Sequence, residues 1–138
     1  MNDNTPNHII KIIGDDRGVL SVIDFANLPF IPQRMFYIRY VPDGTIRGQH
    51  AHKKCSQIFL HISGIIDIAV KEINGSISCN RMKELSPSYI IVEPMEWVEL
   101  KFIGVNGCIL VLCSHPYDED DYIRDFNEFK KMTNGSNL

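Results

Sequence analysis

Short β-forming segments separated by turn residues run along almost the whole chain. The clearest turn signals are Asn74-Gly75 and Asn106-Gly107, because asparagine and glycine both tolerate the positive φ angles of tight hairpins. The strand before Gly64 is predicted to end there. The predicted strands are residues 8–13, 19–23, 35–41, 58–62, 65–73, 76–82, 97–103 and 108–113. Many short strands with turns at close intervals predict an all-β sandwich or barrel.

The end of the chain departs from this β pattern. Tyr122, Phe126 and Phe129 fall at the i, i+4 and i+7 positions of one helical face, so residues 118–132 are predicted to form one amphipathic helix. The acidic run at residues 118–121 is interpreted as favourable charge and capping at the helix N-terminus, in preference to a metal site.

Length and composition predict one globular domain at residues 1–138, with a frayed tail at 133–138. The hydrophobic fraction of 44% and the charged fraction of 22% are ordinary for such a domain, and the net charge of -3 argues against a nucleic-acid partner. The longest apolar runs have only strand length, and the polar N-terminus lacks the regions of a signal peptide. We therefore expect a cytoplasmic protein with no membrane partner.

The cysteines have no C-x-x-C spacing and lie inside apolar runs. They are Cys55, Cys79, Cys108 and Cys113. A structural disulfide or zinc site requires clustered spacing or an oxidising compartment, so we expect reduced core residues.

Residues 47–52 carry the strongest functional signal. His50 and His52 are two apart on a predicted extended segment, so both imidazoles point to one side. Neutral imidazole accepts and returns a proton near neutral pH, as general acid–base catalysis requires. If a histidine of ordinary pKa is the base, activity should fall below about pH 6. Arg47 adds a fixed positive charge suited to a phosphate or a developing oxyanion.

The spacing around these histidines, G-x5-H-x-H-x4-Q-x6-G at residues 44–64, resembles the first signature motif of the cupin superfamily of small β-barrels and jelly rolls. The usual motif has glutamate where this chain has Gln57. In metal-dependent cupins this glutamate and the two histidines bind a divalent ion, with another histidine from a second motif around a later proline. Here Pro94 is present, but residues 88–99 contain no histidine. A carboxamide is a poor metal ligand, so we predict a site without metal.

A wider pattern resembles the sugar 3,4-ketoisomerases. It consists of R-x-x-Y-x-x-x-V-P-x-G-x-x-R-G-x-H-A-H-x-x-x-x-Q at residues 34–57, P-x-x-W at 94–97 and Y-D-E-x-D-Y-I-R at 117–124. The resemblance implies a cupin-type β-barrel or jelly roll acting on dTDP-4-keto-6-deoxyglucose. It also implies a place in deoxyaminosugar biosynthesis for surface polysaccharides such as the O-antigen of lipopolysaccharide.

By this resemblance, the protein is a cofactor-independent isomerase that moves a carbonyl from C4 to C3 of the hexose through an enediolate, without a metal. His50 is implied as the C3 base, and His52 as the proton shuttle between the O3 and O4 oxygens. Family members form homodimers by exchanging N-terminal strands, and residues 8–13 would supply that strand here.

The expected substrate-binding residues are Tyr37, Arg47, Gln57, Trp97 and Arg17. Tyr37 and Arg47 match family positions that line the site, although Tyr37 is equally suited to core filling. Gln57 is expected to hold a substrate hydroxyl or to orient a histidine. Trp97 is suited either to stacking on a base or sugar or to core packing. Arg17 stands where the resemblance begins.

Two residues, His61 and Glu96, depart from the family pattern and leave the stereochemistry of the product open. For His61 a structural role is the preferred interpretation. Three other functions also remain open: a metal-dependent cupin with ligands His50, His52 and Glu99, a dTDP-sugar 3,5-epimerase, and a noncatalytic nucleotide-sugar binding module.

Overall fold

The computed structural model describes residues 9–84 and 89–135. The chain divides into two compact units, Met1–Pro32 and Gln33–Leu138. None of the helices in the described ranges is long and apolar enough to cross a membrane.

The N-terminal unit contains the hairpin that the sequence predicts. Strand β1 (Lys11–Asp15) pairs antiparallel with β2 (Gly18–Val22), and a 3₁₀ turn, η1 (Phe25–Asn27), follows. His8, which begins the predicted strand at 8–13, lies outside the described residues. Several large apolar side chains of the hairpin are exposed in the single chain: Ile12, Ile13, Val19 and Leu20.

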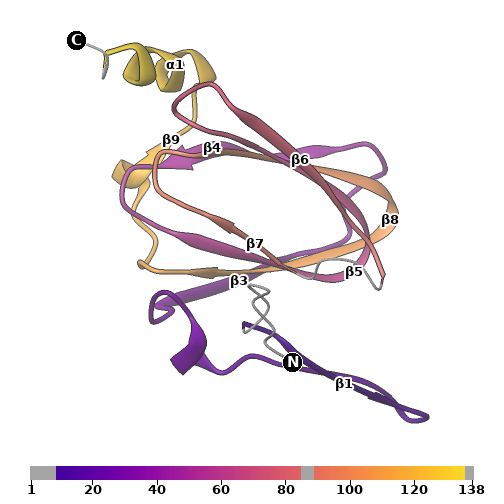
Figure 1. Cartoon of the computed structure of the whole chain (residues 1–138). Coiled ribbons are helices and arrows are strands. Elements are labelled where there is room, and N and C mark those ends of the chain that lie inside the picture. Colours follow the sequence, from indigo (N-terminus) through magenta and orange to yellow (C-terminus); the bar gives the residue numbers. More distant parts are fainter. Residues whose placement is uncertain (1–8, 85–88, 136–138) are drawn as a thin grey trace. The chain divides into compact units, whose positions relative to one another are not determined.

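The larger unit is an antiparallel β-barrel. Its strands are β3 (Arg34–Ile38), β4 (Ile46–His52), β5 (Gln57–Lys71), β6 (Ile77–Met82), β7 (Tyr89–Val92), β8 (Trp97–Cys113) and β9 (Tyr122–Ile123). Figure 1 shows β5 and β8 as two long curved strands, and they pair with each other along their whole length. One layer joins the first half of β5 and the last half of β8 to β7 and β3. The other layer has the order β6-β5-β8-β4-β9.

The long strands correct two predictions, because neither Gly64 nor Asn106-Gly107 ends a strand. Ser63 is paired with Cys108 but Ile65 with Ile103, so β8 bulges opposite Gly64 and both strands turn from one layer into the other. Gly64 has a φ of +74°, and a Cβ there would lie 2.5 Å from the backbone nitrogen of Gly107. Only glycine fits this close approach. The hairpin at Asn74-Gly75 is confirmed, since Glu72 donates its N–H to the Ser76 carbonyl across 2.8 Å.

The barrel interior is filled by apolar side chains from both layers. They include Phe59, Ile66, Ile68, Val70, Val92, Val98, Leu100, Phe102, Ile109 and Val111. Among the cysteines, which are all free, Cys55 and Cys113 are buried as predicted. The prediction is wrong for Cys79, which is exposed on the edge strand β6.

The C-terminal segment corrects the predicted helix at 118–132, because α1 (Phe126–Gly135) begins eight residues later. Residues 118–121 form a 3₁₀ turn, η2 (Glu119–Asp121), capped by the Asp118 side chain, and β9 then pairs with β4. Asp125 accepts hydrogen bonds from the first N–H groups of α1. Of the predicted tail, residues 133–135 belong to α1, and 136–138 lie outside the described residues.

Candidate active site

A bulge in β4 places the two histidines. Gly48 has a φ of +76°, and the pairing with β8 shifts by one residue between Arg47 and His50. Beyond the bulge, His50 and His52 project to the same side, as the sequence predicts, with ring centroids 5.0 Å apart and planes at 87°. His50 lies opposite the core residue Val98, so both rings are directed into one end of the barrel.

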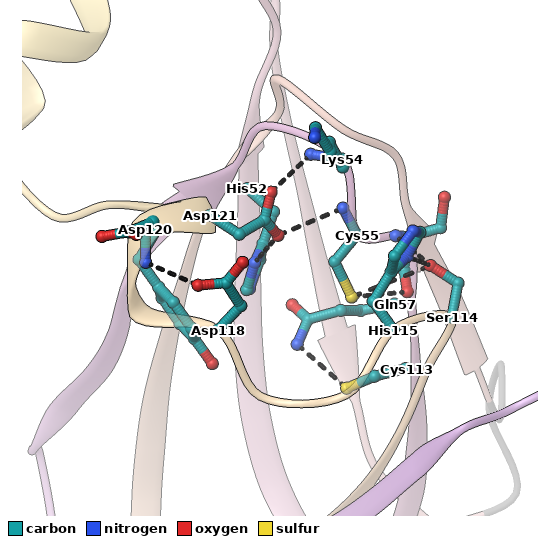
Figure 2. Close-up of polar contacts among 12 residues, drawn as sticks. His52, Lys54, Cys55, Gln57, Cys113, Ser114, His115, Asp118, Asp120 and Asp121 are labelled. Atoms are coloured by element: carbon teal, nitrogen blue, oxygen red, sulfur yellow. Dashed lines mark hydrogen bonds and ion pairs between the residues drawn. The ribbon is translucent and has the colours of Figure 1, made fainter.

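Asp121 holds His52 in one orientation (Figure 2). The Nδ1 of His52 lies 2.9 Å from Asp121 Oδ2, and both side chains are almost fully buried. The backbone N–H groups of Lys54 and Cys55 also donate to the Asp121 carboxylate, at 2.7 Å and 3.2 Å. Burial would raise the pKa of this carboxyl, but the three donors together hold it below its usual value. A carboxylate needs a donor, so Nδ1 of His52 carries the hydrogen and Nε2 is left free.

His50 has a different environment. Burial is the largest effect on its pKa, and the neighbouring His52 adds to it; together they lower the pKa to about 4. The nearby carboxamide of Gln57, which forms no hydrogen bond with the ring in this geometry, opposes this shift, while the charges of Arg124 and Arg34 lower the pKa further. His50 is therefore neutral throughout the physiological pH range and available as a proton acceptor.

Tyr122 and Arg34 complete the surroundings of the histidines. The ring of Tyr122 lies 4.2 Å from that of His52 and 5.2 Å from that of His50, measured between centroids. Arg34 Nη1 donates to the Tyr122 hydroxyl across 3.3 Å. The guanidinium of Arg124 also lies over the ring of Tyr122, 4.2 Å from its centroid. Tyr122 thus contacts both imidazoles and two cations.

Gln57 lies within the same end of the barrel. Its side chain is 1% exposed, and Nε2 donates to the sulfur of Cys113 across 3.4 Å (Figure 2). Its Oε1 is buried and has no hydrogen-bond partner in the described part of the chain. The contact of Gln57 with substrate stays a prediction.

Two of the predicted substrate-binding residues, Tyr37 and Arg47, lie outside this cluster. Arg47 is exposed on β4 ahead of the bulge. Tyr37 is 53% exposed, because β3 directs the alternating Phe36 and Ile38 into the core. Arg17 belongs to the N-terminal unit, where it forms an ion pair with Asp15. Their contacts with substrate remain predictions.

Trp97 has a packing role in the structure. It is 2% exposed and lies against Phe126 and Phe129 of α1, while its Nε1 donates to Glu99 across 3.1 Å. The structural interpretation of His61 is confirmed, since its Nε2 lies 2.6 Å from the Gly64 carbonyl oxygen.

Sequence reasoning missed three residues of the cluster: Arg34, Asp121 and Tyr122. All three stand within the patterns at residues 34–57 and 117–124 that carry the resemblance, which was the available signal. The prediction of a helix over 118–132 concealed Asp121 and Tyr122, because it assigned Asp121 to the helix N-terminus and Tyr122 to the apolar face of the helix.

The metal-dependent alternative requires three protein ligands in one place. The structure does not bring Glu99 to the histidines, and its carboxylate is engaged by Trp97 and by Lys71. Among the described residues, the donor atoms that lie close together are those of His52, Cys55 and Asp121, within 4.8 Å of one another. A metal there would have to break the hydrogen bond between His52 and Asp121.

Comparison with known proteins identifies the family. The family model described as FdtA, WxcM-like, C-terminal, matches residues 3–134. The chain belongs to this family. A TDP-4-oxo-6-deoxy-α-D-glucose-3,4-oxoisomerase of Aneurinibacillus thermoaerophilus is 33% identical over 129 residues, which cover 93% of this chain and 91% of the relative.

Solved structures agree with the family assignment. QdtA, a sugar 3,4-ketoisomerase from Thermoanaerobacterium thermosaccharolyticum in complex with TDP, has a TM-score of 0.84 at 30% identity, over 94% of this chain and 93% of QdtA. A histidine-to-asparagine mutant of QdtA in complex with TDP-4-keto-6-deoxyglucose has a TM-score of 0.83 at 29% identity, covering 91% of each chain. These matches confirm the predicted cupin-type barrel with one C-terminal helix.

The role of Asp121 in this WxcM-like protein can be tested by Asp121→Asn. Asparagine keeps one acceptor oxygen but places an NH2 donor where the second oxygen was, and three N–H groups then compete for a single acceptor, so nitrogen NMR should show the Nδ1–H form of His52 replaced by a mixture. Three hydrogen bonds to a charged group are weakened together, and the free energy of unfolding should fall by about 2 kcal/mol.

The matched control is Asp118→Asn, because Asp118 only caps η2 and asparagine caps equally well. It should leave both measurements unchanged. An unaltered His52 signal in Asp121→Asn would contradict the assigned role of Asp121.

Proposed function

We propose that this protein converts TDP-4-keto-6-deoxyglucose into a TDP-3-keto-6-deoxyhexose, with no cofactor and no metal. The observation that carries the proposal is the pair of imidazoles at one end of the barrel, each with a buried Nε2 that has no hydrogen-bond partner among the described residues. Membership of a family whose relatives carry the name of 3,4-ketoisomerase supports the substrate class. In class the protein is an isomerase.

The environments of the two histidines suggest how they divide the work. His50 is neutral and has no carboxylate partner among the described residues, so it is assigned as the base that removes the C3 proton. His52 donates through Nδ1 to Asp121, whose carboxylate stabilises an imidazolium. His52 is therefore assigned as the group that takes a proton from O3 and returns it to O4.

The electrons balance within the sugar. The C3–H pair forms a C3=C4 double bond as the carbonyl π pair moves onto O4, which gives an enediolate. After the proton passes from O3 to O4, a carbonyl forms at C3 and the C3=C4 pair accepts a proton at C4. C3 is oxidised and C4 is reduced by the same pair, so the reaction requires no external oxidant or reductant.

The proposed product feeds deoxyaminosugar synthesis for surface polysaccharides, because a 3-keto group is the site at which an amine is introduced by transamination. This assignment rests on the resemblance in residues 34–57 and 117–124. This biosynthetic assignment is a more specific claim than membership of the isomerase class.

Proton NMR of the purified protein with TDP-4-keto-6-deoxyglucose in deuterated water tests the function. We expect a 3-keto sugar with deuterium at C4, with an undiminished rate after treatment with a chelator, and no conversion by His50→Asn. The ring couplings name the epimer formed.

Exchange at C5 with no 3-keto product would instead indicate a 3,5-epimerase. Activity that returns only with an added divalent ion would support a metal-dependent cupin, and TDP binding without turnover a binding module. Each of these outcomes overturns the proposal.

The pH dependence of turnover tests the assignment of the base. His50 must be unprotonated to act as a base, and its lowered pKa keeps it unprotonated in mildly acidic solution. We therefore expect kcat/KM to stay constant down to about pH 5 and to fall towards pH 4. This replaces the expectation of a fall below about pH 6, since burial was not visible in the sequence. An acid limb near pH 6.5 would contradict His50 as the base.

We also propose that the protein is a homodimer formed by exchange of its N-terminal strands. The support is the exposed apolar hairpin β1–β2, whose side chains a second copy would cover. Light scattering should give twice the chain mass, and the double variant Ile12→Lys, Leu20→Lys should give a monomer.

The matched control is Ile77→Lys on β6. Ile77 is 62% exposed, close to the 58% of both hairpin residues, and it belongs to the other unit. This variant should stay dimeric. A monomeric native protein, or a dimer unaffected by the hairpin substitutions, would contradict strand exchange.

A further inference from the structure

Four buried polar atoms in the described part of the barrel lack a hydrogen-bond partner. They are Arg34 Nε, His50 Nε2, His52 Nε2 and Gln57 Oε1. An unpaired buried donor or acceptor is destabilising, so such atoms in a native fold call for a ligand. The histidines and Gln57 have assigned or expected roles. The guanidinium of Arg34 has none.

The strand register places Arg34 beside these residues. Cys113 of β8 is paired with Arg34 of β3 on one side and with Gln57 of β5 on the other, so the three side chains form a row across one layer. Direct neighbours across a sheet point to the same face, which here is the barrel interior. The two histidines come from β4, which belongs to the other layer (Figure 1).

The contacts of Arg34 tie it to both histidines. Its Nη1 donates to the hydroxyl of Tyr122, whose ring touches the rings of His50 and His52. Described cations such as Arg17, Arg81 and Arg124 have a carboxylate partner, but Arg34 has no such partner within the described residues. A half-buried guanidinium without a counter-ion is prepared to receive negative charge.

We propose that Arg34 is a catalytic residue that binds the O3 and O4 oxygens of the enediolate. This proposal rests on the proposed ketoisomerase function. The two oxygens are adjacent and coplanar in the enediolate, and a guanidinium offers parallel N–H donors in one plane. Negative charge develops on O4 as the C3 proton leaves, so Arg34 binds the intermediate more strongly than the neutral ketone.

Arg34 thereby takes the oxyanion role that the sequence suggested for Arg47, which the structure places on an exposed stretch of β4. Its charge also helps to keep His50 unprotonated, so one group favours both the free base and the intermediate. Two other roles for Arg34 make different predictions: binding of the diphosphate of the substrate, and packing against the rings of Phe36 and Tyr117, each 5.7 Å from the guanidinium carbon.

The test compares Arg34→Ala and Arg34→Lys with the native protein, using the NMR assay for turnover, calorimetry for TDP affinity and thermal unfolding for stability. We expect Arg34→Ala to lower kcat by about 100- to 1000-fold, the usual effect of removing an oxyanion donor, with TDP affinity within about threefold of native. Arg34→Lys keeps the charge but not the paired donors, and should lose about 10- to 100-fold. Added guanidinium chloride at millimolar concentration should restore part of the turnover of Arg34→Ala and none of that of Arg34→Lys.

The control Arg81→Ala removes an exposed arginine on β6 that pairs with Asp67, and it should leave kcat unchanged. A fall in TDP affinity that matches the fall in kcat/KM, with kcat retained, would overturn the proposal in favour of diphosphate binding. A fall in melting temperature without rescue by guanidinium, together with full kcat in Arg34→Lys, would assign packing alone. If the native protein produces no 3-keto sugar, the proposed function is wrong. If the native protein is active and Arg34→Ala is equally active, only the proposed role of Arg34 is wrong.

Discussion

The hydrogen bond between His52 and Asp121 joins the two parts of the chain from which the site is built. One partner ends β4, the other ends the turn before β9, and the same carboxylate receives the N–H groups of the loop that leads into β5. Hydrogen bonds to a charged group contribute about 1.5–3 kcal/mol each, so this cluster fixes the loop as firmly as it fixes the ring. This one carboxylate therefore orients His52 and holds the loop that follows β4, next to the point where β9 begins to pair with β4.

Two identical side chains acquire different chemistry from their surroundings. His50 is buried beside another imidazole and two cations, which keeps it neutral. His52 is more deeply buried and has a carboxylate on its Nδ1. Two histidines in identical surroundings would not be distinguished as a base and a proton carrier. In the proposed mechanism, environment and not residue type distinguishes the base from the proton carrier.

Local patterns in the sequence predicted what depends on local geometry. Alternation along an extended strand put His50 and His52 on one side, and the cupin-like spacing placed Gln57 near them. The failures involve pairing between distant segments. Gly64 and Asn106-Gly107 have the composition of turns, yet each lies at the bend of a long strand, because β5 and β8 stabilise each other on both sides of it.

The same distinction explains the arginines and the C-terminal segment. Which face of a strand a residue occupies depends on where a bulge falls, and the sequence alone did not locate the bulge at Gly48 that leaves Arg47 outside. Helical spacing at residues 118–132 was genuine for Phe126 and Phe129, which pack on Trp97. Tyr122 shares that spacing but pairs with β4, because a long-range strand contact outweighed local periodicity.

The site is assembled from segments far apart in the chain: His52 and Asp121 are separated by 69 positions, and Arg34 and Tyr122 by 88. Folds dominated by such distant contacts close slowly, because the entropy of a long loop is lost before the contact stabilises it. A ribosome that has released β3 to β8 has still not released the turn that orients His52. Each new molecule therefore becomes catalytically competent only when its C-terminal turn has folded. Turnover is then a stricter measure of complete folding than the content of β-structure.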